Sequence, residues 1–207
     1  MFVETSDPAY RTSIFNSLVA PRPIGWVSSC SPTGQINLAP FSYFNGISAT
    51  PPMLMFACNA PADRNEKDTL ANVRATGEFC VNIVSYALRE QMNITSSTVP
   101  HGDDEFELAG LEKGDCKFVK CPRVLAAPAS MECQLIQIVD VAPTRDGERT
   151  SSVVLGRVLA MHVRDDLLDD AGRFDPVRAQ SMARLGGFNY LRVTEMFAIK
   201  RPDPKGE

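Results

Sequence analysis

The sequence predicts a mainly β fold, an antiparallel barrel with peripheral helices. About seven segments have the length and composition of strands, and hairpin turns rather than strand–helix–strand units connect them. Few segments have the spacing of amphipathic helices. The chain of 207 residues can bury a sizeable core and contains no linker, so we expect one domain over residues 1–207.

A helix and a β-hairpin are the first expected elements. Asp7-Pro8 predicts a helix start, and apolar residues at helical spacing continue the helix to Leu18. Strands are expected at residues 24–30 and 35–39. The turn sequence Ser31-Pro32-Thr33-Gly34 separates them, so the two strands form a hairpin.

The next expected elements are strands and short helices. A continuous apolar run at residues 52–58 indicates a strand buried on both faces. A helix is expected at residues 68–76, with Asp68 or Thr69 as its cap and Gly77 at its end. The elements expected after it are a strand at residues 79–84 and a helix from Ser85 to about Met92.

Residues 95–130 are rich in proline, glycine and charge, and we expect an irregular insertion with a possible role at an interface. Residues 131–135 alternate with period two and residues 136–138 continue in the opposite phase, which predicts a strand with a bulge. The elements expected at the end of the chain are a hairpin turn at Asp146-Gly147, a strand at 153–163, an acidic loop at 165–176, a helix at 177–185 ended by Gly186-Gly187, a strand at 190–199 and a frayed tail at 200–207.

Composition excludes several classes of protein. The formal net charge is −4 and no basic block is present, which argues against a nucleic-acid partner. No apolar run approaches the roughly 20 residues of a membrane helix, so we expect no membrane partner. The first residues have neither a basic start nor an apolar stretch, so no signal peptide is expected.

The six cysteines are scattered without a C-x-x-C pair, which is typical of a protein of the reducing cytoplasm. Cys116 and Cys121 flank two lysines, which either lower a thiol pKa or are incidental on a loop. His101 and His162 lie near no cysteine in the sequence, and the acidic loop after His101 lacks the spacing of a zinc or calcium site. We therefore expect no metal site.

The hairpin carries the first chemical signal. Its first strand is an apolar run that ends in Ser28 and Ser29, and its second strand carries Asn37 and leads into an aromatic loop. We expect these three polar residues to lie close together near the open end of the hairpin. Small polar donors beside flat apolar side chains suit a phosphorylated ligand that contains a ring.

Four patches of sequence resemble one family. They are Arg22-Pro23-Ile24-Gly25-Trp26-Val27-Ser28, Asn37-Leu38-Ala39-Pro40-Phe41-Ser42, Lys67-Asp68-Thr69, and Arg184-Leu185-Gly186-Gly187 with Tyr190. In this order they resemble the flavin reductase-like family of FMN-binding split-barrel proteins. The resemblance covers most of the chain. It implies a six- or seven-stranded split barrel with peripheral helices, and a homodimer with the flavin near the subunit boundary.

Lys67 and Thr69 are the expected phosphate contacts. A helix start supplies backbone N–H groups and a favourable dipole, and Lys67 adds an ammonium group. The charge of Asp68 would repel a phosphate, so we expect its side chain to turn back as a helix cap. The resemblance matches Lys67 and Thr69 to phosphate contacts of the family, although the segment alone also fits an ordinary capped surface helix.

The remaining expected cofactor contacts surround the ring and the ribityl chain. Trp26 and Val27 are expected in an apolar wall, with hydroxyl groups from the serines, an amide from Asn37 and backbone groups from the loop. Arg184 can pair with phosphate and Tyr190 can cover the ring; the aromatic residues also fit a protein core. The full expected set is Trp26, Val27, Ser28, Ser29, Asn37, Leu38, Ala39, Ser42, Lys67, Thr69, Arg184 and Tyr190.

The resemblance implies an FMN-binding oxidoreductase that passes hydride from NADH or NADPH through FMN to a second acceptor. The flavin ring carries the redox chemistry, so no side chain is expected to be catalytic. No Gly-x-Gly-x-x-Gly fingerprint is present, which argues against a dinucleotide-binding fold. The alternatives are a flavoredoxin-like electron carrier, a non-catalytic ligand-binding barrel and, more remotely, a pyridoxal-type oxidase. The sequence assigns no role to His162.

Overall fold

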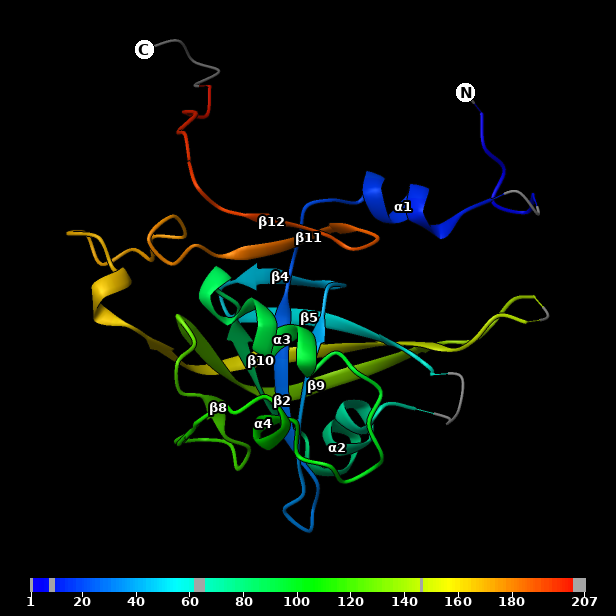
Figure 1. Cartoon of the computed structure of the whole chain (residues 1–207), viewed down its shortest axis with the longest axis horizontal. Helices are drawn as coiled ribbons and strands as arrows, with labels where there is room; N and C mark the ends of the chain where they lie inside the picture. Colours follow the sequence, from blue (N-terminus) through cyan, green and yellow to red (C-terminus); the bar gives the residue numbers. More distant parts are fainter. Residues whose placement is uncertain (1, 8–9, 62–65, 146, 203–207) are drawn as a thin grey trace.

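A curled antiparallel sheet of seven strands forms the body of the molecule (Figure 1). The computed structural model describes residues 2–7, 10–61, 66–145 and 147–202. The strand order is β3-β2-β6-β9-β10-β5-β4, and β1-β11-β12 and β7-β8 form two small sheets. The strands are β1 Arg22–Pro23, β2 Gly25–Cys30, β3 Ile36–Phe41, β4 Phe44–Ala49, β5 Pro52–Asn59, β6 Glu78–Ile83, β7 Lys113–Gly114, β8 Arg123–Val124, β9 Ala129–Val141, β10 Ser151–Val163, β11 Met182–Gly186 and β12 Asn189–Arg192. The helices are α1 Thr12–Leu18, α2 Asp68–Thr76, α3 Arg89–Ile94 and α4 Glu105–Leu108, with 3-10 turns η1 Tyr86–Leu88 and η2 Asp165–Leu167.

The inner face of the curled sheet encloses the main hydrophobic core. The rings of Phe41 and Phe56 lie 5.0 Å apart and join β3 to β5 across the interior. Leu70 and Val73 of α2 belong to the same core, so α2 covers one end of the barrel. The predicted antiparallel split barrel with few helices is confirmed.

A second core lies on the outer face of β2, β3 and β6. Trp26 and Leu38 pack there with Phe106 of α4 and Val124 of β8. Residues 95–130 therefore fold against the barrel, as Figure 1 shows for α4 and β8. Because both faces of these strands are covered, the side chains of β2 are buried on whichever face they lie, up to Ser29.

The two longest strands, β9 and β10, contain register shifts. One shift leaves Ile136 without a direct partner between Leu135 and Gln137, which confirms the bulge predicted from the change of phase. A second shift makes Leu159 the extra residue of β10. No helix of the described residues is long and apolar enough to cross a membrane.

The predicted helix at residues 177–185 is wrong. Residues 182–186 form β11, whose Arg184 pairs with Arg22 of β1 and with Tyr190 of β12. Gly186 and Gly187 make the turn between β11 and β12 with positive φ values of 121° and 55°, instead of ending a helix. Pairing with a segment distant in sequence thus overrides the helical spacing, and the strand predicted to reach residue 199 ends at Arg192.

Other boundaries also differ from the sequence predictions. The helix α1 begins at Thr12, and Pro8 of the predicted start lies outside the described residues. The strand β4 was not predicted. The prediction that the strand at residues 52–58 is buried on both faces is wrong. In β5 only Leu54, Phe56 and Cys58 are buried, because only one face of this strand lies in the barrel. Asp146 of the predicted hairpin turn and the tail from residue 203 lie outside the described residues.

Candidate functional site

An open groove runs between β3, the first turn of α2 and the segment after α3. Its first part is lined by Asn37, Ala39, Pro40, Pro61, Lys67, Asp68, Thr69, Thr95, Ser96, Ser97, Thr98, Val99 and Glu105. Its second part is lined by Ile24, Pro40, Ser42, Met92, Ser96, Arg184 and Tyr190. Pro40 and Ser96 line both parts, so the two parts adjoin each other between the start of α2 and the β11–β12 hairpin.

The start of α2 gives one end of the groove an electropositive character. Lys67 is the N-cap residue in an extended conformation and makes no side-chain cap hydrogen bond. The N–H groups of Thr69 and Leu70 have no partner within the helix, because the first turn of any α-helix lacks acceptors. The Lys67 ammonium lies 5.4 Å from the centre of the Phe41 ring. Ammonium, helix dipole and backbone donors together suit an anion.

The predicted N-cap of α2, Asp68 or Thr69, is wrong because Lys67 is the N-cap, whereas Gly77 ends the helix as predicted. The Asp68 carboxylate lies 2.9 Å from Nδ1 of His101. The Thr69 hydroxyl accepts a hydrogen bond of 2.8 Å from the Asn37 amide. This second bond ties the helix start to β3, so Lys67, Thr69 and Asn37 meet at one place in the groove.

At the opposite end, Arg184 is held in place by the hairpin that carries it. Its guanidinium lies 4.5 Å from the centre of the Tyr190 ring and donates hydrogen bonds to the Tyr190 hydroxyl and the Gly187 carbonyl. Ser42 lies at the same end of the groove. The structure thus brings a cation, an aromatic ring and a hydroxyl together beside the apolar Ile24 and Met92.

Glu105 places a buried carboxyl group in the groove. Only 5% of the residue is exposed, and its Oε2 accepts a 2.9 Å hydrogen bond from the Leu38 N–H. Burial raises the pKa of Glu105, and the nearby charges of Asp68 and Asp104 raise it further, against the lowering by the backbone hydrogen bonds. The Glu105 carboxyl group therefore takes up a proton more readily than a solvent-exposed glutamate does.

The flavin reductase-like domain model matches residues 18–178, well over half of the chain. The chain belongs to the flavin reductase-like family. An uncharacterized protein of Aquifex aeolicus is 41% identical over 176 residues, which cover 85% of this chain and 86% of the relative.

Two solved structures are similar to this family member along nearly their whole length. Nitrilotriacetate monooxygenase component B from Bacillus cereus has a TM-score of 0.87 at 29% identity, and the match covers 96% of this chain and 98% of that chain. The 2-nitrobenzoate 2-nitroreductase NbaA of Pseudomonas fluorescens has a TM-score of 0.83 at 30% identity, covering 98% and 96%.

In this member of the flavin reductase-like family, five of the predicted contact residues do not line the groove. Trp26, Val27 and Leu38 have no exposed surface and lie in the two cores. Ser28 donates a 2.6 Å hydrogen bond to the Pro122 carbonyl, and Ser29 accepts one of 3.1 Å from Asn72. The central position of β2 explains this, since both of its faces are covered.

The hairpin geometry also differs from the expectation. Ser29 pairs with Asn37, only one pair before Cys30 and Ile36 lead into the turn. These polar residues therefore lie near the closed end of the hairpin, where α2 packs, rather than near its open end. The Leu38 N–H is occupied by Glu105 and cannot serve a ligand.

Sequence reasoning missed the wall of the groove opposite β3. Four consecutive hydroxyl residues, Thr95 to Thr98, follow α3 and line this wall. Thr95 accepts a 2.8 Å hydrogen bond from the Trp26 indole, which fixes the start of the run. Such a run of hydroxyls directly after a helix was the available signal, although it falls in the segment predicted to be irregular.

Proposed function

We propose that this protein is an FMN-binding oxidoreductase that takes hydride from NADH or NADPH and passes electrons to a second acceptor. The observation that carries the proposal is the pair of adjoining hollows, one with Lys67 and the start of α2 and the other with Arg184 and Tyr190. When bound, FMN supplies the hydride acceptance and donation that protein side chains cannot perform.

The donor set at the α2 end fits a phosphate. Lys67 and the Thr69 hydroxyl, with backbone N–H groups of the first helical turn, would hold the phosphate. The bond from Asn37 to Thr69 fixes the position of that hydroxyl.

The rest of the groove fits a polar chain and a planar ring. The hydroxyl wall from Thr95 to Thr98 faces β3, where Ala39 and Pro40 offer apolar surface. The ring would lie toward Ser42, Arg184 and Tyr190, where aromatic, cationic and hydroxyl groups converge. These side chains bind and orient the ring and contribute no proton transfer of their own.

The names of the two similar solved proteins support a redox role for this family member. One is a component of a monooxygenase and the other is a nitroreductase, and both align over at least 96% of this chain. Both names describe oxidation–reduction chemistry. Neither name identifies the electron acceptor of this protein.

An absorption spectrum followed by an NADH titration tests the proposal. Purified protein, or protein supplied with FMN, should show flavin absorption and release one FMN per chain on extraction. NADH or NADPH should then be oxidised with saturation kinetics when free flavin is in excess. A single stoichiometric reduction would identify an electron carrier instead, and a chain that takes up no FMN would refute the whole assignment.

We also propose that the protein is a homodimer of the cytoplasm. Apolar side chains without cover on this chain support a second copy: Phe15 and Leu18 of α1 are 49% and 78% exposed, and Phe197 and Ile199 are 84% and 82% exposed. All six cysteines are free, as expected in a reducing compartment. Light scattering coupled to size-exclusion chromatography should give twice the chain mass of 22.7 kDa.

A further inference from the structure

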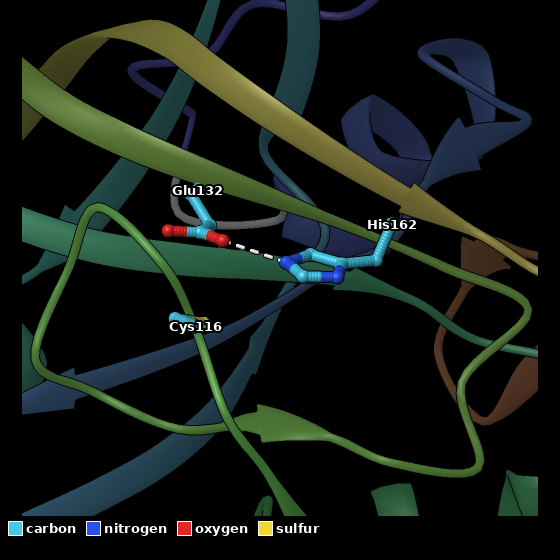
Figure 2. A group of neighbouring side chains, drawn as sticks. All are labelled: Cys116, Glu132 and His162. Atoms are coloured by element: carbon cyan, nitrogen blue, oxygen red, sulfur yellow. Dashed lines mark hydrogen bonds and ion pairs between the residues drawn. The ribbon is translucent and has the colours of Figure 1, made fainter.

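A cluster of three potential metal ligands lies on β9, β10 and the loop before β8 (Figure 2). Glu132 and His162 come from neighbouring strands, where Ala160 pairs with Glu132 and His162 pairs with Ser130. Side chains two residues apart share one face of a strand, so Glu132 and His162 are diagonal neighbours on one face. Cys116 reaches this face from the loop between β7 and β8.

We propose that Cys116, Glu132 and His162 bind a borderline divalent cation, with Zn²⁺ as the preferred ion. The thiolate sulfur, the carboxylate oxygen and the imidazole nitrogen all lie within 4.8 Å of one another. Three such ligands with a fourth position for water form a common zinc arrangement. None of the three residues lines the groove, so the site is an addition to the proposed flavin function.

Small movements are enough to build the coordination geometry. Zinc–ligand bonds of about 2.0–2.3 Å in a tetrahedron place ligand atoms roughly 3.3–3.6 Å apart. Oε1 of Glu132 is now 2.6 Å from Nε2 of His162, so this pair has to open by less than about 1 Å. The sulfur has to approach by roughly 1 Å or a little more from the upper limit of the cluster.

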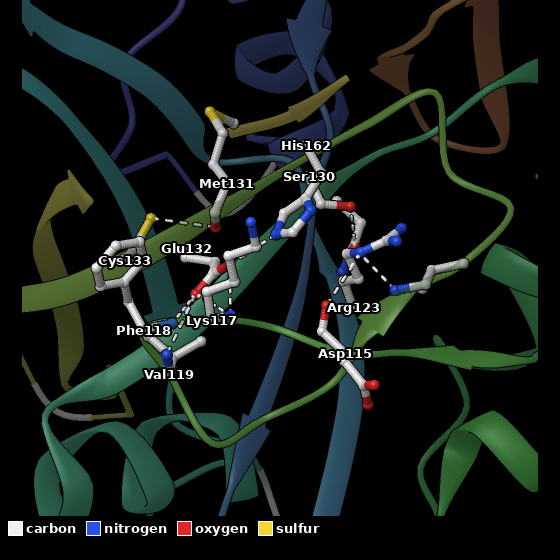
Figure 3. A network of polar contacts seen from close by, with 12 residues as sticks. Asp115, Lys117, Phe118, Val119, Arg123, Ser130, Met131, Glu132, Cys133 and His162 are labelled. Atoms are coloured by element: carbon white, nitrogen blue, oxygen red, sulfur yellow. Dashed lines mark hydrogen bonds and ion pairs between the residues drawn. The ribbon is translucent and has the colours of Figure 1, made fainter. Parts of the chain in front are cut away.

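The surroundings hold the ligands in place. Oε2 of Glu132 accepts backbone hydrogen bonds from Phe118 and Val119, and the Lys117 N–H is shared between Oε2 and Oε1. Oε1 also lies against His162 (Figure 3). Cys116 packs against the small buried cluster of Cys80, Val119 and Cys121. Hydrogen-bond partners such as those of Glu132 orient metal ligands in known sites.

Charge and access also suit a dication. As metal ligands, a thiolate and a carboxylate would bring two negative charges to a dication, and an imidazole would bring none. His162 keeps 24% of its side chain exposed, so an ion can reach the cluster from solvent.

Cobalt binding to the untagged, full-length protein tests the site, because Co²⁺ reports its ligands by absorption. We expect one Co²⁺ per chain with tetrahedral ligand-field bands and a sulfur-to-cobalt charge-transfer band, and displacement of Co²⁺ by Zn²⁺. Cys116→Ser should abolish the charge-transfer band. Cys116→Ser and His162→Gln should each weaken Zn²⁺ binding by at least about 100-fold, since loss of a supporting partner alone costs about 10–100-fold.

Matched controls come from the same chain. Cys30→Ser removes a half-buried cysteine that, like Cys116, packs against Cys80, Val119 and Cys121 but is not one of the three ligands. His101→Gln removes the other histidine. Both should bind Zn²⁺ as the parent protein does, and circular dichroism should show that each variant is folded. Cobalt binding without a charge-transfer band overturns the proposal. Equal Zn²⁺ affinity in His162→Gln and His101→Gln also overturns the proposal. This comparison can be made even if Cys116→Ser does not fold.

Discussion

Glu105 and Glu132 are both buried, at 5% and 0% exposure, yet their pKa values shift in opposite directions. Burial raises the pKa of both groups. For Glu132, hydrogen bonds from three successive backbone N–H groups and from His162 outweigh burial and lower the pKa. Glu105 accepts a hydrogen bond from the Leu38 N–H, burial dominates, and its pKa rises. The number of donors, more than the depth of burial, sets the direction of the pKa shift of these two carboxyl groups.

The two glutamates also fasten the same segment to the barrel. Glu105 lies in residues 95–130 and accepts from β3, and Glu132 lies in β9 and accepts from residues 117–119. The hydrogen bonds of Glu132 should therefore contribute most to stability. The hydrogen bond of Glu105, whose pKa is raised, should contribute least or oppose folding at neutral pH.

Glu132→Gln should have the largest effect. The amide replaces one oxygen by an NH₂ group that faces either the backbone donors or His162, so buried donors lose their acceptor. We expect a loss of roughly 3–5 kcal/mol in the free energy of unfolding. Urea denaturation at pH 7 measures it, with His162→Gln as the control that removes a single contact. A loss below about 1 kcal/mol would show that the donor set is not the source of stability.

Ser28→Ala removes a neutral tie between β2 and the same segment. The Ser28 hydroxyl donates to the Pro122 carbonyl at 2.6 Å, and its loss leaves that carbonyl without this donor. We expect about 1–2 kcal/mol of destabilisation, less than for the charged tie. FMN affinity should not change, because Ser28 does not line the groove. A loss of FMN affinity of about tenfold in folded protein would show that Ser28 contributes to FMN binding.

Glu105→Gln should have the smallest effect on stability, and the opposite sign. The Gln oxygen keeps the Leu38 hydrogen bond, while the charge near Asp68 and Asp104 is removed. We expect a gain of roughly 1 kcal/mol at pH 7 and no gain near pH 4, where the parent carboxyl group is protonated. Denaturation curves at the two pH values decide, and an equal gain at both would contradict the raised pKa.

The pH dependence of the parent protein follows from the same comparison. A raised folded pKa means that the native state binds more protons, so the Glu105 contribution falls as pH rises from about 4.3 through that folded pKa. The lowered pKa of Glu132 acts in reverse: its contribution is complete above about pH 4.3 and is lost as pH falls through the folded pKa.

The local features of the fold could be predicted from the sequence. The turn from Ser31 to Gly34 and the bulge at Ile136 depend on neighbouring residues, and both are found where the pattern places them. The helix predicted at residues 177–185 failed because β1 and β12 capture the segment. Pairing over long sequence distances leaves no trace in helical spacing.

In the candidate site, too, the local features could be predicted from the sequence and the long-range contacts could not. Lys67 and Asn37 lie in the groove because a helix start and a strand each carry one of them. Ser28 and Ser29 do not line the groove, because α2 and the loop before β8 cover β2 and supply their hydrogen-bond partners. The residues near them in the sequence do not indicate that β2 is covered. The approach of Cys116 to Glu132 and His162 likewise depends on segments that meet only in the folded chain.

The most direct test of the account compares FMN with riboflavin, which lacks the phosphate, in the parent protein and in Lys67→Ala. Loss of a charge-assisted contact predicts FMN binding weakened by about 10–100-fold and riboflavin affinity unchanged within about twofold. Lys120→Ala, outside the groove, should change neither. Equal weakening of both ligands in Lys67→Ala would contradict a phosphate site at the start of α2.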